Sequence, residues 1–458
     1  YAEGPDVYRS FAVVPELDAP VWVEAVEFNP GNYRVAHHAF FAIDRTGRAI
    51  DLDAEDAETG FAGMSDLEAN AQKPIDQFLS WQVGRQPDDP QPGVAWRLNP
   101  GDVIVFEMHL IATGKPEQVQ ATMGLHFADQ PPTKHPVMVA FVGQEIDIPA
   151  GESEYVVTNE YRLPIEATVT GILPHAHYLG KQTHAWATLP DGSRQWLIRI
   201  DDWDLNWQSA YYYAQPIHLP AGSVITQHFV FDNSAANPRN PFSPPRHVQY
   251  GREATDEMAE LHVQFMFDSP EKAASLRRDS DAWRIRLRGE RFERALARNP
   301  NDAAAQLEVG KVDLALGRAD AAQQRFEKAL ELDFDLAEAH YFMGYLLMLR
   351  KDYVTARVRF TYAVSIDPSD FRSQCGIAKT YFEEGNYSAA GHEYAKALNL
   401  NDDDPIAHVG FANTLAKVGQ YEQAARHFRE AYRLDADNKS ALYAAQTIEA
   451  ELKRRSQP

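Results

Sequence analysis

Five histidines and one methionine of this chain have the spacing expected of metal ligands. His175 and His177 are separated by one residue in an apolar context, and side chains at positions i and i+2 of a strand project from the same face. The two imidazoles could therefore hold one metal ion together. Met258 follows two acidic residues and could add a thioether ligand, and copper favours a combination of imidazole with thioether.

A second set of candidate ligands lies nearer the N-terminus, where His37 and His38 are adjacent and His109 stands alone. Adjacent side chains of a regular strand point to opposite faces, so this pair needs a bend or a bulge to reach one ion. Geometry alone leaves an alternative open, in which one histidine of the pair is buried and the other is exposed. Zinc is the competing metal because it also binds clustered histidines, whereas the methionine favours copper.

The residues that must position these side chains have the pattern of β-strands as far as about residue 268. Short alternating runs, such as 21–26 and 103–106, are separated by turn signals such as the Asn-Pro-Gly run at 99–101. Many short strands at this spacing predict antiparallel β-sandwiches. The loop at 233–245 is dense in Asn, Pro and Ser, so we expect no regular element there.

From residue 269 onward the sequence has helical periodicity and a repeat of 34 residues. Small residues at fixed points of the repeat would let paired helices approach closely, and an aromatic residue would fill the gap between repeats. This register resembles the tetratricopeptide repeat, with a half-repeat upstream and a capping helix at 439–455. The residues in register are Ala322, Ala356, Ala390 and Ala424, then Phe326, Phe360, Tyr394 and Phe428, then Ala329, Ala363, Ala397 and Ala431.

The histidine motifs and their flanking residues resemble the copper type II, ascorbate-dependent monooxygenases, the family of peptidylglycine α-hydroxylating monooxygenase and dopamine β-monooxygenase. The likeness is closest to the bacterial members and covers roughly residues 7–267, including the runs 203–208 and 256–258. It implies two antiparallel β-sandwich domains, which we place at 1–146 and 147–268. The linker, half-repeat, tetratricopeptide repeats and capping helix would then occupy residues 269–458.

The same resemblance implies two copper ions per chain, one in each sandwich domain. His37, His38 and His109 would bind the copper that stores and delivers an electron. His175, His177 and Met258 would form the catalytic site, where the second copper meets O2. Ascorbate or a similar one-electron donor would be the co-substrate of such an enzyme.

Three positions depart from the pattern of the peptide-hydroxylating members of that family. Leu173 stands where those members have an arginine that binds the substrate carboxylate, and Glu260 and His262 replace an asparagine and a tyrosine. A peptide carboxylate would lose its cationic partner and meet a negative charge at this site. We therefore expect a substrate with an oxidisable C–H bond that is not a glycine-extended peptide, and its identity stays open. His262 could also act as an alternative ligand or as an acid–base group.

Composition limits the partners and the compartment. A formal net charge of −22 argues against a nucleic-acid partner, because binding polyphosphate depends on Lys and Arg. No apolar run is long enough to span a membrane. Cys375 is the single cysteine, so no intrachain disulfide can form, and the start at Tyr1 without Met or a signal segment suggests a processed product. The resembling family is exported, which implies a periplasmic or extracellular location.

Two functional hypotheses follow. The first is a copper-dependent monooxygenase whose repeats dock a protein or peptide in their groove, although the repeats could instead serve self-association or stability. His340 and His408, at the fourth position of their repeats, could contact the partner or could be ordinary surface histidines. The alternative is a non-catalytic copper-binding or scaffold protein that acts mainly through its repeats.

Overall fold

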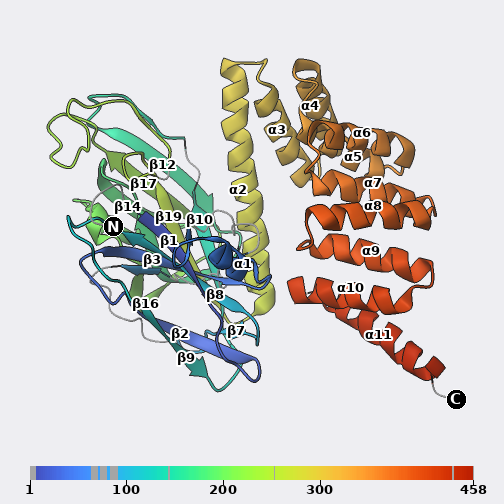
Figure 1. Ribbon diagram of the computed structural model, residues 1–458. Coiled ribbons are helices and arrows are strands. Elements are labelled where there is room, and N and C mark those ends of the chain that lie inside the picture. The colour runs from blue at the N-terminus through green and yellow to red at the C-terminus, as the bar shows by residue number, and fades with distance from the viewer. Residues whose placement is uncertain are drawn as a thin grey trace. The chain divides into compact units, whose positions relative to one another are not determined.

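The chain forms two compact units, Tyr1–Arg284 and Ile285–Pro458 (Figure 1). Residues 1–6, where the first predicted domain begins, lie outside the described part of the chain, and the predicted boundaries at 146/147 and 268/269 stay predictions. The structure, a computed structural model, describes residues 7–62, 71–72, 80–82, 91–142, 145–251, 253–435 and 438–456.

The first unit begins with two antiparallel sheets. The larger has the strand order β4-β1-β8-β3-β5, with β6 also paired to β3, and the smaller has the order β7-β2-β9. A short helix, α1 (Arg48–Glu55), follows β3. The strands are β1 (Val7–Val13), β2 (Val21–Asn29), β3 (Ala36–Asp44), β4 (Phe61–Ala62), β5 (Ala71–Gln72), β6 (Ser80–Gln82), β7 (Trp96–Leu98), β8 (Val103–Leu110) and β9 (Thr122–Ala128).

Alternation along these strands sends apolar side chains into a core that both sheets share. Phe28 of β2 packs against Phe41 of β3 and Phe106 of β8, with ring centroids 5.1 Å and 5.6 Å away. Val23 of β2 and Ile104 of β8 belong to a second buried cluster between the same two sheets. The alternating runs that predicted strands in the sequence therefore mark the residues that hold these sheets together.

Three further sheets complete the first unit, with orders β10-β19-β13-β16, β12-β17-β14-β15 and β11-β18. A single 3-10 turn, Leu205–Trp207, interrupts the connection after β15. The strands are β10 (His135–Phe141), β11 (Asp147–Ile148), β12 (Tyr155–Arg162), β13 (Ala167–His175), β14 (Gly180–Thr188), β15 (Arg194–Ile200), β16 (Tyr211–Leu219), β17 (Val224–Phe231), β18 (Val248–Gln249) and β19 (Glu260–Phe267).

The prediction of a β-rich N-terminal region is thus confirmed. Residues 233–245 contain turns and bends but no helix or strand, as their composition predicted. Asn233 explains how this loop is held, because its buried side-chain amide donates to the carbonyl oxygens of Pro149 at 3.0 Å and Arg246 at 2.8 Å.

Helix α2 (Pro270–Arg298) begins in the first unit and ends in the second, and successive helical hairpins follow it (Figure 1). No helix among the described residues is both long and apolar enough to cross a membrane. The hairpin helices are α3 (Ala303–Ala315), α4 (Ala319–Leu332), α5 (Ala337–Leu349), α6 (Tyr353–Ile366), α7 (Phe371–Glu383), α8 (Tyr387–Leu400), α9 (Pro405–Lys417), α10 (Tyr421–Leu434) and α11 (Lys439–Ser456).

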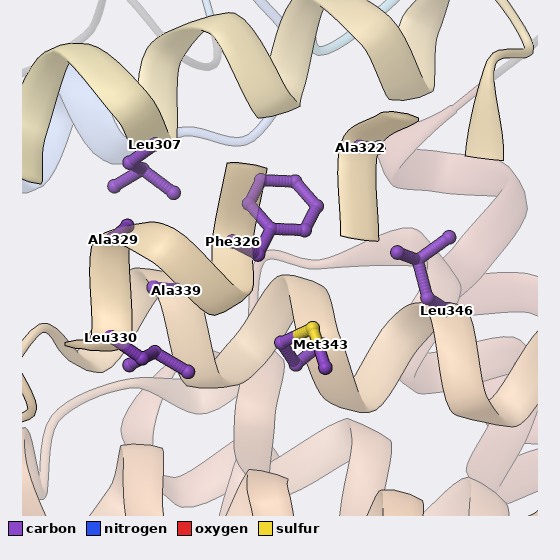
Figure 2. Close-up of a cluster of buried hydrophobic side chains, with 8 residues drawn as sticks. All are labelled: Leu307, Ala322, Phe326, Ala329, Leu330, Ala339, Met343 and Leu346. Atoms are coloured by element: carbon purple, nitrogen blue, oxygen red, sulfur yellow. The ribbon is translucent and has the colours of Figure 1, made fainter. Parts of the chain in front are cut away.

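The residues in the 34-residue register form the contacts between paired helices. Ala322, Phe326 and Ala329 of α4 are fully buried and pack with Met343 of α5 in one cluster (Figure 2). A Cβ atom at Gly310 of α3 would lie only 2.5 Å from Cε1 of Phe326. The prediction that small residues permit the close approach of paired helices is confirmed at this point.

Candidate metal centre

The His37-His38 pair lies on β3, next to the strand that carries His109. In the antiparallel ladder between β3 and β8, His38 is directly opposite His109, and the register shifts between Ala36 and His38. His37 occupies this irregularity. The bulge that an adjacent pair needs to direct both rings toward one point is therefore present.

The three rings meet through the same kind of atom. Nδ1 of His38 lies 3.1 Å from Nδ1 of His37 and 3.4 Å from Nδ1 of His109. Nitrogens that bind one ion at about 2.0–2.1 Å each would be about 3–3.5 Å apart, so the observed separations fit a shared cation. Within the described ranges, these residues form the one group of three or more His, Cys, Asp or Glu whose ligand atoms lie close enough to hold a metal, all within 4.8 Å.

Electrostatics keep His38 in the form that binds metals. Burial, and then the neighbouring charges of His109 and His37, hold the pKa of His38 far below its usual value. The charge of His175 lowers the pKa of His38 by a smaller amount. A neutral imidazole offers a lone pair to a cation, whereas an imidazolium does not.

Tyr8 of β1 fixes one side of the group. Its ring stacks on that of His109 with centroids 4.4 Å apart and an angle of 7° between the planes, because Tyr8 and His109 are opposite one another in the β1–β8 ladder. Ring stacking of this kind limits the rotation of the imidazole, so a side chain that the motifs did not single out helps to orient a candidate ligand.

The second histidine group differs from the strand geometry that the sequence predicted. His175 is the last residue of β13, but His177 lies in the turn before β14, so the i and i+2 rule for one strand face does not apply. The turn closes with the Gly180 N–H, which donates to the His177 carbonyl at 3.2 Å. The two rings nevertheless lie together, with centroids 5.1 Å apart and planes at 86°.

Each ring of this group is held through its Nδ1 atom. Nδ1 of His175 is 2.5 Å from the side-chain oxygen of Gln208, and Nδ1 of His177 is 3.1 Å from the backbone oxygen of Asp256. Both partners accept hydrogen bonds, so Nδ1 carries the proton in each neutral ring and Nε2 keeps the lone pair. Burial lowers the pKa of His175, and burial followed by the charge of His175 lowers the pKa of His177 to about 4.

A buried carboxyl group, that of Glu257, joins this turn to the segment that carries Met258. Oε2 of Glu257 accepts the backbone N–H groups of His177 at 2.8 Å and of Met258 at 3.0 Å. Oε1 accepts the N–H of Leu179 at 2.7 Å. Burial raises the pKa of Glu257 to about 8, against the effect of these backbone donors. One side chain thus ties two segments that are 80 residues apart in the sequence.

Met258, the predicted third ligand, precedes β19 and is half-buried, beside the residue whose carboxylate organises the histidine turn. The ladder between β13 and β19 places Glu260 opposite His175 and His262 opposite Leu173. The three positions that depart from the resembling family therefore lie next to the second histidine group. Nε2 of His262 is 3.6 Å from a carboxylate oxygen of Glu260.

Sequence reasoning missed the supporting residues. Tyr8, Gln208 and Glu257 lie within the residues that the family resemblance covers, but no sequence pattern assigns a partner to any of them. A polar residue within an apolar run is the available signal, because a buried polar group needs a hydrogen-bond partner. The partners themselves come from other strands, which the sequence does not place.

In the repeats, the structure corrects one interpretation. His340 and His408 are buried, so they do not line an accessible inner surface. Nε2 of His340 is 2.9 Å from the carbonyl oxygen of Phe334, and Nε2 of His408 is 2.7 Å from that of Asp402. Each histidine thus anchors the loop that precedes its own repeat, six residues earlier in the chain.

Comparison with known proteins identifies the repeats. Two tetratricopeptide-repeat family models match, over residues 289–344 and 371–404. Among solved structures, YrrB, described as a TPR protein with an unusual peptide-binding site, is 23% identical and covers 37% of this chain and 87% of its own, with a TM-score of 0.32. MamA is 19% identical and covers 32% of this chain and 87% of its own, with a TM-score of 0.29. None of the curated proteins that were compared matches significantly. The C-terminal region therefore contains tetratricopeptide repeats, and the likeness to copper monooxygenases stays a prediction.

Proposed function

We propose that this chain is a copper-binding protein that docks a partner protein through its tetratricopeptide repeats. The observation that carries the metal assignment is the meeting of three imidazole nitrogens, from His37, His38 and His109. Copper suits an all-imidazole site of this kind, and when bound it would supply one-electron redox chemistry. The repeats support the docking role, since stacked helical hairpins present an extended surface for another polypeptide.

Metal titration tests the first half of the proposal. Purified chain is loaded anaerobically with Cu(I), and bound copper is counted for the wild type and for His109→Ala. The matched control is His126→Ala, an exposed histidine of the same unit that lies outside the group. We expect His109→Ala to lose one copper per chain and His126→Ala to lose none. Equal copper content in all three proteins would overturn the assignment.

Competition with zinc separates the two candidate metals. The loaded protein is dialysed against Zn(II) under reducing conditions, and the metal retained by the wild type is compared with that retained by Met258→Leu. A thioether ligand would favour copper, so we expect Met258→Leu to retain less copper than the wild type. Replacement of all copper by zinc in the wild type would favour a structural zinc protein instead.

A second function, copper-dependent monooxygenation of a C–H bond, is favoured by the second histidine group. His175 and His177 keep both Nε2 lone pairs available, and Met258 is tied to the same turn through Glu257. The corresponding cofactors would be two copper ions per chain, with ascorbate or a similar donor and O2 as co-substrates. In this proposal His175, His177 and Met258 form the catalytic site, and the protein's part is to hold them open to substrate.

Oxygen consumption distinguishes the two functions. Copper-loaded chain is supplied with ascorbate, and O2 uptake is followed for the wild type and His175→Ala. If the chain is an enzyme, the wild type should consume O2 even without substrate, and His175→Ala should abolish this uptake. Uptake equal to that of free copper, or unchanged in the variant, would leave a binding protein and remove the catalytic assignment.

We extend the proposal to architecture and location. The shared core of the first two sheets supports a β-sandwich within 1–146, and the sheets that contain β13 and β14 would form a second sandwich within 147–268. Strand β10 (His135–Phe141) precedes the predicted boundary but pairs with β19, so it would belong to the second sandwich. A periplasmic or extracellular location follows only from the resembling family. Limited proteolysis between β9 and β10, at residues 129–134, that releases two stable fragments would support two separate sandwich domains.

A further inference from the structure

Each tetratricopeptide repeat carries a pair of polar residues, one on each helix of its hairpin. The first member is the fourth residue of the repeat, and the second lies 19 residues later, on the second helix. The pairs are Gln306 with Arg325, His340 with Arg359, Gln374 with Glu393, and His408 with His427.

The last pair differs from the other three, which combine two different side chains. The guanidinium of Arg325 donates to the side-chain oxygen of Gln306 at 3.1 Å, and the amide of Gln374 donates to the carboxylate of Glu393. The repeat fold is thus satisfied by other polar pairs at these positions. It does not require the two imidazoles that the last repeat places there.

His408 of α9 and His427 of α10 each direct one ring nitrogen toward the other. Their Nδ1 atoms are 2.9 Å apart, whereas the ring centroids are 5.2 Å apart. The ring planes differ by 28°, so the two rings meet end to end and not face to face. Two potential ligand atoms, one from each helix, therefore lie together between α9 and α10.

The other nitrogen of His408 fixes which of its atoms keeps a lone pair. Nε2 of this buried ring is 2.7 Å from the carbonyl oxygen of Asp402. A carbonyl oxygen only accepts, so Nε2 carries the proton and Nδ1 keeps the lone pair. Histidines that bind metals have the same arrangement, since a hydrogen bond from the second ring nitrogen to a carbonyl group orients the ring.

His427 is half-buried and neutral near pH 7. Burial, then the charges of His408 and Arg426, lower its pKa to about 4, and the charge of Glu430 acts in the opposite direction. In the metal-free chain, Nδ1–H of His427 donates to Nδ1 of His408. A neutral imidazole can carry its proton on either nitrogen, so a shift of this proton to Nε2 of His427 gives the second Nδ1 a lone pair as well.

We propose that His408 and His427 bind a divalent transition-metal ion of the zinc and copper class, which links α9 to α10. The ion takes the place of the shared proton. Imidazole nitrogens at about 2.0–2.1 Å from one ion are about 3–3.5 Å apart, so the rings separate by a few tenths of an ångström. Water on the half-buried side of His427 completes the coordination. The site belongs to the repeat unit and does not depend on the histidine groups of the β-rich unit or on the proposed function.

The bound ion should make the last hairpin open less often. Amide hydrogen exchange, followed by mass spectrometry on the full-length chain, measures this opening separately for each helix. Zinc bound elsewhere in the chain does not interfere, because the measurement is local. At a free Zn(II) concentration about tenfold above the dissociation constant, we expect exchange in α9 and α10 to slow by about tenfold. Mg(II), which prefers oxygen ligands, should have no effect at the same concentration.

Two variants remove a ligand but keep a pair that another repeat already uses. His427→Arg gives the last repeat the residue that stands at Arg325 and Arg359, and His408→Gln gives it the residue that stands at Gln306 and Gln374. The repeat fold should tolerate both. The matched control is His392→Gln, which removes an exposed histidine of α8 that lies outside the pair.

The outcomes separate a metal site from a hydrogen bond between two histidines. We expect Zn(II) to protect α9 and α10 in the wild type and in His392→Gln, but not in His427→Arg or His408→Gln. Bound zinc should also fall by one ion per chain in each of the last two variants. If Zn(II) leaves exchange in the wild type unchanged, the two rings form only a hydrogen bond and the proposal is overturned. Equal protection of the wild type and both ligand variants would overturn it as well.

Discussion

The repeat unit and the β-rich unit bring residues together over very different distances in the sequence. In the repeats, Gly310 packs against Phe326 of the next helix, and the same contact recurs between Gly344 and Phe360. In the β-rich unit, His109 meets a histidine 71 residues earlier, and the carboxylate of Glu257 reaches backbone groups 80 residues earlier. Local contacts can be recognised from a repeating pattern, whereas a site built from distant strands depends on their register.

The largest effect is expected from a substitution that disrupts the metal site of the β-rich unit. Replacing His38 by Ala removes the central nitrogen of the three-histidine group, to which both other Nδ1 atoms are close. We expect complete loss of metal from this site with little change in the repeat unit. Copper stoichiometry and the unfolding of the repeats, followed by circular dichroism at helical wavelengths, measure the two effects. Retention of full metal content would show that the rings do not act together.

The next prediction applies to the repeats. A methyl group at Gly310 would lie 2.5 Å from Cε1 of Phe326, so Gly310→Ala should cost about 1–3 kcal/mol of unfolding free energy. Gly391 of α8 provides the control, because its nearest neighbour to an added Cβ is a methyl of Thr414 at 3.7 Å. Gly391→Ala should instead stabilise by up to about 1 kcal/mol through helix propensity. Urea unfolding checks both, and equal effects of the two variants would contradict the packing argument.

The third prediction concerns Glu257 of the β-rich unit, where a small substitution should affect the second histidine group and not the first. Glu257→Gln keeps the size of the side chain but turns one hydrogen-bond acceptor toward a backbone N–H into a donor. The His177 turn and the Met258 segment would then be held less well, and we expect copper at this second group to bind about 10–100-fold more weakly. The three-histidine group, counted in the same titration, is the internal reference. Unchanged affinity at both groups would show that Glu257 has no positioning role.

The last prediction concerns pH. Burial keeps the pKa of His177 at about 4 in the native state, below the value of 6.5 for a free histidine, and the pKa values of His38 and His175 are lowered for the same reason. Below pH 6.5 the unfolded chain takes up protons that the native metal-free chain does not. Stability of the β-rich unit should therefore fall as the pH decreases from 6.5 toward 4, by up to about 1.4 kcal/mol per pH unit for each such histidine.

Urea midpoints of the metal-free protein, measured at several pH values across this window, check the direction. His177→Asn removes one of the titrating groups and should make the dependence less steep. Midpoints that stay constant, or that rise on acidification, would contradict the burial of neutral histidines.

Some features could be predicted from particular residues. The alanine and aromatic positions of the repeats fixed the helix pairs, because each pair is a local unit that recurs with the same contacts. The His37-His38 pair required a bulge, and β3 has one beside His109. The strand placement of His177 was wrong, since the chain turns after His175 and a side-chain pattern of two residues does not distinguish a strand end from a strand.

By itself, the sequence determined the repeat unit and the identity of the candidate ligands, since both depend on residue type and short-range spacing. The tertiary structure alone decided which nitrogen of each histidine is available. The first group meets through Nδ1, while Gln208 and Asp256 occupy Nδ1 in the second group and leave Nε2. It also brought Tyr8 and Glu257 to the two groups. The physical reason is that strand register and buried hydrogen bonds are set by contacts between distant segments, which no local pattern records.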